Sequence, residues 1–146
     1  MKIIIIILVV IIIVLLGVLL FVQPVKGPTV SVQTPQAATS PDGSIMVSAP
    51  ETNAIITSPV AIAGSAKGWY FEAVFPVKIL DGDGTVLGSG QAHAQSDWMT
   101  TSSVPFLATV SFTTPKYATG TIVFRKDNPS GLPKHDEEFS LPIRFR

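Results

Sequence analysis

The feature that most constrains this chain is an apolar run near its N-terminus. The run begins at Ile3 and ends at Val22, and its twenty residues include no charged, polar or Pro side chain. A helix rises about 1.5 Å per residue, so about twenty residues cross a hydrocarbon core of about 30 Å. In lipid the backbone must satisfy its own hydrogen bonds, which a helix does within one segment. We therefore predict one transmembrane helix over residues 1–22. Its apolar residues 3–22 anchor the chain in a membrane.

A cleaved secretory signal is the competing interpretation of this run. Such signals have an apolar region of about 7–15 residues, followed by small residues at the cleavage site. The run is longer than that, and residues 23–28 contain no such site, so we predict an uncleaved signal anchor. A short leading segment usually stays in the cytoplasm. We therefore expect a single-pass protein of the cell membrane with a cytoplasmic N-terminus and an extracytoplasmic C-terminal domain.

Residues 23–50 differ from the run in composition, being rich in Pro, Ser and Thr. Prolines recur at short intervals, which prevents a helix or a central strand from running through the segment. Such a segment buries too little apolar surface to offset the entropy of ordering it, so it predicts a semi-extended linker. Residues 44–47 are either a first short strand or an apolar patch on that linker.

Composition excludes several classes of function for the remaining residues. The chain has ten basic and ten acidic residues, so there is no excess positive charge for binding nucleic acid. It has no Cys, which excludes disulfides, thiolate metal ligands and Cys nucleophiles. The domain must therefore be held together by packing alone.

Residues 51–146 show apolar side chains at every second position, with turn residues between the runs. Phe106, Ala108, Val110 and Phe112 alternate with polar or smaller neighbours, and the last eight residues show the same period. No segment has a sustained helical period. We therefore predict an all-β fold, an immunoglobulin-like two-sheet β-sandwich of about seven strands behind the N-terminal transmembrane helix. The expected strands lie near residues 53–57, 60–66, 70–80, 85–94, 104–113, 119–126 and 138–145.

An ordered series of short motifs runs through these strands and turns. It includes Ser58-Pro59-Val60, Trp69-Tyr70-Phe71-Glu72-Ala73, Asp81-Gly82-Asp83-Gly84, Asp97-Trp98-Met99, Asp127-Asn128-Pro129-Ser130-Gly131 and Leu141-Pro142-Ile143-Arg144-Phe145. As a set, over about residues 53–146, they resemble the bacterial spore germination immunoglobulin-like domain family. The resemblance implies an immunoglobulin-like sandwich on the outer side of a bacterial membrane, without known catalytic residues.

Two patterns could indicate a metal or catalytic site. Asp81-Gly82-Asp83-Gly84-Thr85 resembles the opening of a calcium loop, but the further acidic ligands of that loop are missing. Asp-Gly between two β runs favours a hairpin turn instead. His93 and His135 have no partner at a catalytic or metal-binding spacing. We therefore predict no catalytic residue, no metal and no cofactor.

Aromatic side chains are candidates for contact with a partner. Trp98 beside Asp97 is either a ligand platform or a plug at the end of the sandwich, with Asp97 bonding turn amides. Three consecutive aromatics begin at Trp69 and Tyr70, and in an alternating strand they cannot all face one core. We therefore predict that one of them lies on a partner surface.

The turn-forming and charged residues of segment 127–138 predict a loop. Asn128, Ser130 and Gly131 are its turn-forming residues, and long loops on rigid sandwiches often carry recognition. A solvated turn is the simpler alternative. Asn128 is not a glycosylation acceptor, because Pro129 follows it.

These observations predict a membrane-anchored, extracytoplasmic, non-catalytic binding or structural module of the bacterial cell envelope. The resemblance relates it to sporulation and germination proteins. The expected partner is an envelope protein or a cell-wall polymer, and no nucleic acid. A wall-acting enzyme and an accessory subunit of a membrane complex are the alternatives.

Overall fold

The computed structural model describes residues 37–146, which form nine strands and one short 3-10 turn. The predicted anchor, the orientation of the chain in a membrane and most of the predicted linker lie outside these residues. Within residues 37–146, no helix reaches the length and apolar character that crossing a membrane requires. The elements are β1 (Ala38–Thr39), β2 (Ile45–Ala49), β3 (Ile55–Ile56), β4 (Val60–Ala66), β5 (Val74–Asp81), β6 (Val86–Ala94), β7 (Val104–Val110), β8 (Thr119–Arg125), η1 (Pro133–His135) and β9 (Glu138–Phe145).

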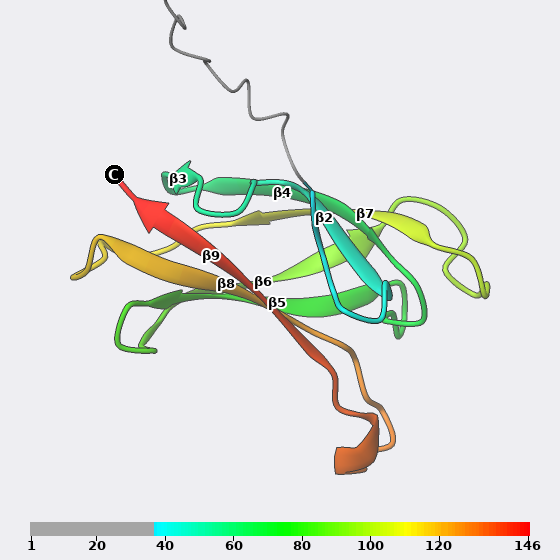
Figure 1. Cartoon of the computed structure of the whole chain (residues 1–146). Helices are drawn as coiled ribbons and strands as arrows, with labels where there is room; N and C mark the ends of the chain where they lie inside the picture. Colours follow the sequence, from blue (N-terminus) through cyan, green and yellow to red (C-terminus); the bar gives the residue numbers. More distant parts are fainter. Residues whose placement is uncertain (1–36) are drawn as a thin grey trace, which may run out of the picture. The chain divides into compact units, whose positions relative to one another are not determined.

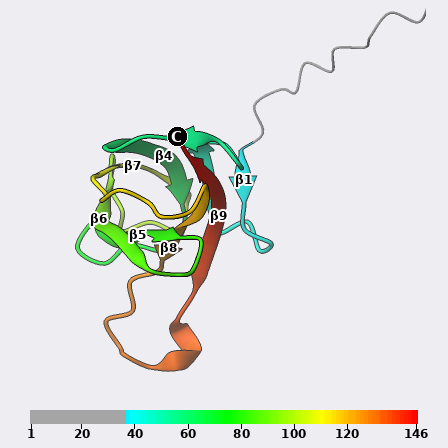
Figure 2. The same ribbon diagram turned by 90° about the vertical axis from the view of Figure 1, so that its left-hand side faces the viewer.

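All nine strands belong to one hydrogen-bonded sheet in the order β1-β2-β4-β7-β6-β5-β8-β9-β3. The sheet curls over so that β4 and β7 form one layer opposite β5 and β8 (Figure 1). Viewed along a perpendicular direction, β6 and β9 close the two sides (Figure 2). Neighbouring strands are antiparallel except for β3, which pairs parallel with β9. The prediction of an all-β fold is confirmed.

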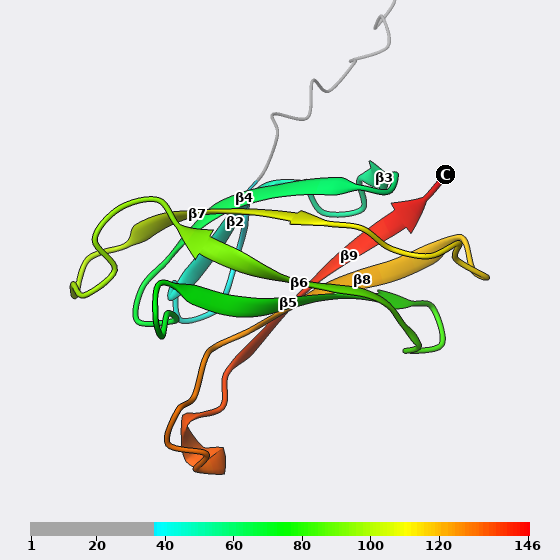
Figure 3. The same ribbon diagram turned by 180° about the vertical axis from the view of Figure 1, so that it is seen from behind.

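The two predicted sheets are two layers of this one sheet, joined where β6 meets β7. Only His93 and Ala94 of β6 pair with β7, opposite Leu107 and Phe106. Beyond that point β6 passes beneath β7 (Figure 3). The two segments approach closely there, because a Cβ placed on Gly88 would lie 2.3 Å from the carbonyl oxygen of Ser111. Only a residue without a side chain fits this crossing.

The core lies between the layers and follows the predicted alternation. In β7 every second residue is buried, from Val104 to Val110, and β5 buries Phe75, Val77 and Ile79. The ring centroids of Phe75 and Phe106 lie 5.1 Å apart in an edge-to-face arrangement across the two layers. Aromatic pairs in this geometry add about 0.5–1.5 kcal/mol to the free energy gained from burying their area.

The segment before β5 departs from the prediction of a strand over residues 70–80. Glu72 and Ala73 have φ values of 51° and 66°, which reverse the chain, and β5 begins only at Val74. Non-Gly residues rarely adopt these angles. As a result Phe71 lies outside β5 and has 42% of its surface exposed, whereas Phe75 is fully buried.

The folded unit also begins earlier than the predicted boundary at residue 51. Residues 38–49, which were assigned to the linker, form β1 and β2 at one edge of the sheet. Ile45 and Val47 of β2 are fully buried. The alternative of a first strand at residues 44–47 is therefore the correct one, because β2 pairs with β4 and places Ile45 and Val47 in the core.

This correction generates the first prediction. A chain that begins at residue 37 should be more stable than one that begins at residue 51, because the shorter chain loses the burial of Ile45 and Val47. Burial of two such side chains contributes about 3–6 kcal/mol. Urea unfolding followed by circular dichroism measures the difference. Equal midpoints would show that β1 and β2 contribute nothing to the fold.

Candidate functional site

Four loops meet at one end of the domain, which we call the loop end. They are residues 40–44, 67–73, 95–103 and 126–137. The register brings them together, since Ala66 pairs with both Ile45 and Val104, and Arg125 pairs with Glu138. The longest of them projects from the sandwich and is coloured orange in Figure 1. Loops on a rigid sandwich are the usual place for recognition.

Trp69 and Tyr70 hold these loops to one another. The indole Nε1 of Trp69 donates to Ser44 Oγ at 3.0 Å, and the carbonyl oxygen of Trp69 accepts from the amide of Asp127 at 3.1 Å. The Tyr70 hydroxyl donates to the carbonyl oxygen of Val104 at 2.6 Å. Burial raises the pKa of Tyr70 to about 12. Tyr70 therefore keeps its proton and remains a donor throughout the physiological pH range.

The prediction that Trp69 or Tyr70 lies on a partner surface is wrong. Only 1% of Trp69 and 8% of Tyr70 is exposed, and both rings pack against Phe75. Strict alternation does not apply to Trp69 and Tyr70, because they lie in the loop between β4 and β5, but the three aromatics do not all face the core, as expected. Phe71 is the exposed member of the three.

Asp97 and Trp98 lie in the loop between β6 and β7. Asp97 Oδ1 accepts from the amide of Met99 at 3.0 Å, so Asp97 bonds a turn amide, as the structural alternative predicted. Trp98 is half-buried and packs against the edge of the core. Its neighbour Met99 is 76% exposed. Trp98 thus anchors the loop and presents part of its ring at the surface.

Asn128 organises the loop between β8 and β9. Its Nδ2 donates to the carbonyl oxygen of Leu132 at 2.9 Å and to Asp136 Oδ1 at 2.8 Å, while its Oδ1 accepts from Ser130 Oγ at 2.5 Å. Gly131 takes a φ of 64°, which favours glycine. Ser130 and Gly131 are exposed, and Leu132 is 49% exposed. The loop is therefore internally bonded and presents its tip to solvent.

A polar depression of about 460 Å³ lies between the four loops. Lys126 and Glu137 form an ion pair at one wall, with 3.1 Å between Nζ and Oε1. Sequence reasoning missed most of this depression, because its residues are dispersed along the chain and belong to no motif. Its lining consists of Asp42, Gly43, Ser44, Lys67, Gly68, Thr100, Thr101, Lys126 and Glu137.

Asp42 lies at the rim of this depression and accepts several hydrogen bonds. Ser40 Oγ donates to Asp42 Oδ1 at 2.6 Å, and the amide and hydroxyl of Ser44 donate at 3.2 and 3.0 Å. These hydrogen bonds, chiefly that of Ser40, lower the pKa of Asp42 to about 2. Asp42 therefore stays charged and shapes the β1–β2 turn at the rim of the depression.

The other sequence candidates lie away from the loop end or form no site. The Asp81-Gly82-Asp83-Gly84 segment joins β5 to β6 as the predicted hairpin. The buried carboxylate of Asp81 accepts from the amides of Lys116 and Tyr117. His93 is exposed on β6, and His135 is exposed in η1. Within residues 37–146, no three His, Cys, Asp or Glu side chains are grouped so that they could hold a metal.

Comparison with known families assigns the domain. Residues 44–132 match the family described as the immunoglobulin-like domain of bacterial spore germination. The chain belongs to this family. The match confirms the resemblance inferred from the short motifs and the immunoglobulin-like classification of the all-β fold. It begins at residue 44, directly before β2, in agreement with the earlier start of the folded unit. Family membership indicates a non-catalytic module. The searches of curated proteins and of solved structures gave no significant match.

The hydrogen bonds of Asp42 predict a pH dependence of stability. The folded-state pKa of about 2 lies below the ordinary value of 3.8, so charged Asp42 stabilises the fold above about pH 4, and this contribution is lost as the pH falls toward 2. Asp42→Asn should therefore lower the melting temperature at pH 7 and have little effect near pH 2. Glu72→Gln at an exposed turn is the control. An equal decrease in melting temperature at pH 7 and near pH 2 would contradict the stabilising role of charged Asp42.

The different burial of the two tryptophans predicts different costs of truncation. Trp69→Ala removes a fully buried ring and the donor to Ser44, so it should lower the free energy of unfolding by about 3–5 kcal/mol. Trp98→Ala should cost about 0.5–3 kcal/mol, because part of its ring is already in water. Chemical denaturation of both variants measures this order, and the reverse order would show that Trp98 is the main anchor of the loops.

Proposed function

We propose that this chain is a membrane-anchored, extracytoplasmic binding module of the bacterial cell envelope, and that its loop end contacts the partner. The proposed partner is an envelope protein or a cell-wall polymer. Family membership supports a non-catalytic role at the outer side of a bacterial membrane. The apolar run from Ile3 to Val22 supports the anchor.

The observation that carries the proposal is the bonded assembly of four loops around one depression. Segments separated by up to about one hundred residues meet there, joined by the hydrogen bonds of Trp69 with Ser44 and Asp127 and of Tyr70 with Val104. The ion pair between Lys126 and Glu137 closes the base of the longest loop. Such bonds fix the loops before a partner arrives. Less conformational entropy is then lost on binding than with free loops.

The chemistry of the loop end suits a partner with both polar and apolar groups. The depression presents hydroxyl groups of Thr100 and Thr101 beside charged side chains, so it can both donate and accept hydrogen bonds. Around it Met99 and Phe71 are exposed by 76% and 42%. An apolar anchor beside a polar contact area is the usual composition of a recognition surface.

Site-specific photo-crosslinking of the full chain in its source cells tests the proposal. A photoreactive residue at Met99 or Ser130 should capture a specific envelope protein or wall polymer. The same residue at Ser140, exposed on an outer sheet face, is the matched control. Equal capture from all three positions would contradict recognition by the loop end. Release of the chain from membranes by alkaline carbonate would independently contradict the anchor.

A further inference from the structure

Residues 88–92 of β6 are not paired with β7, although the two segments are joined on both sides of them. After β6, the amide of Gln95 donates to the carbonyl oxygen of Pro105 at 2.8 Å. Near the start of β6, the carbonyl oxygen of Leu87 accepts from the amide of Thr113 at 3.1 Å. We call the opening between these two bonds the split.

The two joined ends of the split lie in one continuous register. His93 is opposite Leu107, and the residue six positions earlier on β6 is bonded to the residue six positions later on the other segment. The same register would pair Gln91 with Thr109, yet this pair is absent from the ladder. The next pair, at Ser89, is absent too. Two rungs of an otherwise continuous ladder are therefore missing.

The backbone groups of β6 at the missing rungs point into the split. In an antiparallel ladder, successive residues direct their N–H and C=O groups to opposite sides of the strand. The amide of Ala94 donates at 2.8 Å to the carbonyl oxygen of Ala73, directly before β5. By alternation, Gln91 and Ser89 direct their N–H and C=O groups away from β5. Both residues are exposed, and each offers one donor and one acceptor.

The crossing of the two strands keeps the split open. A Cβ placed on Gly90 would lie 3.0 Å from Cγ2 of the buried Val110, just as one on Gly88 would meet the carbonyl oxygen of Ser111. The inward side of β6 thus rests on β7, so β7 lies under β6 here rather than beside it. Among residues 37–146, no strand lies beside the edge of β6 between the two joined ends.

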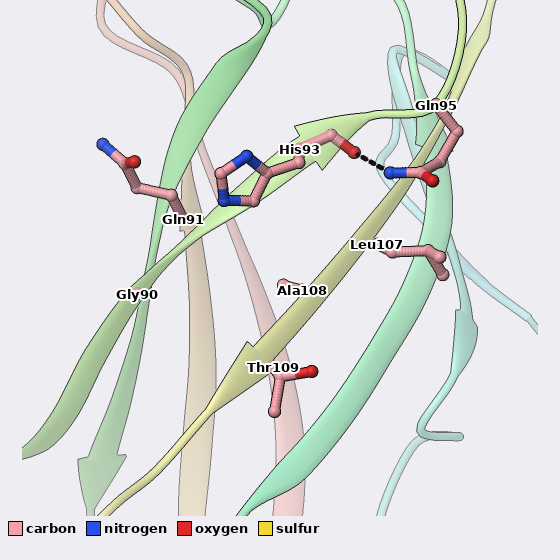
Figure 4. A pocket seen from close by; sticks show the side chains of 7 residues that line it. All are labelled: Gly90, Gln91, His93, Gln95, Leu107, Ala108 and Thr109. Atoms are coloured by element: carbon pink, nitrogen blue, oxygen red, sulfur yellow. Dashed lines mark hydrogen bonds between the residues drawn. The ribbon is translucent and has the colours of Figure 1, made fainter.

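A depression of about 520 Å³ lies at this edge. Gln91, His93 and Gln95 line it from β6 and the residue after it, while Leu107 and Thr109 line it from β7 (Figure 4). None of its lining residues is Asp, Glu, Lys or Arg. The depression can therefore select a ligand by hydrogen bonds and shape, but not by charge.

We propose that the split binds a single extended peptide segment of a partner protein, which adds a strand beside β6. An unpaired strand edge recognises an extended backbone, because the donors and acceptors of the two repeat at the same spacing. The bonds of Gln95 and Leu87 close both ends, so the edge of a folded sheet cannot lie along the split. A lone segment of about five residues, about 17 Å long, can. The proposal involves neither the loop end nor the anchor and does not depend on the proposed function.

A peptide copy of the segment that the register assigns to this edge is the first probe. The acetylated and amidated peptide of residues 107–113 should bind the full-length chain in detergent and slow hydrogen exchange at the amides of Ser89 and Gln91 at least tenfold. The same peptide, N-methylated at residues 109 and 111 so that it cannot donate, is the matched control. Equal binding of both peptides, no binding at millimolar concentration, or slow exchange at both amides before the peptide is added would overturn the proposal.

Substitution of Gln91 separates recognition of the backbone from recognition of the side chain. Gln91→Pro removes the N–H that points into the split and no bond to β5, so it should weaken peptide binding about tenfold without unfolding the domain. Gln91→Ala keeps this N–H and should bind the peptide as the wild-type chain does. Circular dichroism checks that both variants fold. Equal affinities of the two variants would overturn the proposal, and the N-methylated peptide gives the same comparison without any change to the chain.

Discussion

The structure depends on a row of aromatic rings that connects the loop end with both layers. Trp69 contacts Phe75 at 5.7 Å between ring centroids, Phe75 contacts Phe106 at 5.1 Å, and Phe106 contacts Phe124 at 6.1 Å. Phe75 and Phe124 lie in one layer and Phe106 in the other. A chain without Cys cannot join its layers by a disulfide, so this row takes over that role through packing. Because Trp69 also bonds two loops, the core and the loop end are directly connected.

The sequence was sufficient to predict the strands whose side chains alternate over a long enough run. β7 and β9 are such strands, because each has one face in the core and one in water. The Asp-Gly hairpin was also predictable, since it depends on local turn chemistry alone. The sequence favours the linker for β2 and leaves a first strand as the alternative, because its five residues follow a Pro- and Ser-rich segment and acquire their role only by pairing with β4.

The loop end was harder to predict for a different physical reason. Glu72 and Ala73 adopt positive φ values, which cannot be predicted from their residue types. The turn that they form allows Trp69 and Tyr70 to be buried in the core. Asp97, Trp98 and Asn128 were recognised as loop residues, and the structure places them at one end. The depression between the loops could not be predicted, because it exists only when strands far apart in sequence are in register.

The outer surfaces of the domain differ in how far they depend on the core. Strands β2, β4, β6 and β7 contain no Asp, Glu, Lys or Arg, whereas Lys78, Arg125, Glu138 and Arg144 on β5, β8 and β9 are exposed. The loop end differs from both, because its depression combines both signs of charge and is formed by loops that the buried Trp69 and Tyr70 hold together. A substitution in the aromatic row therefore alters the loop end without changing an exposed residue, whereas a substitution on an outer strand face leaves the loop end in place.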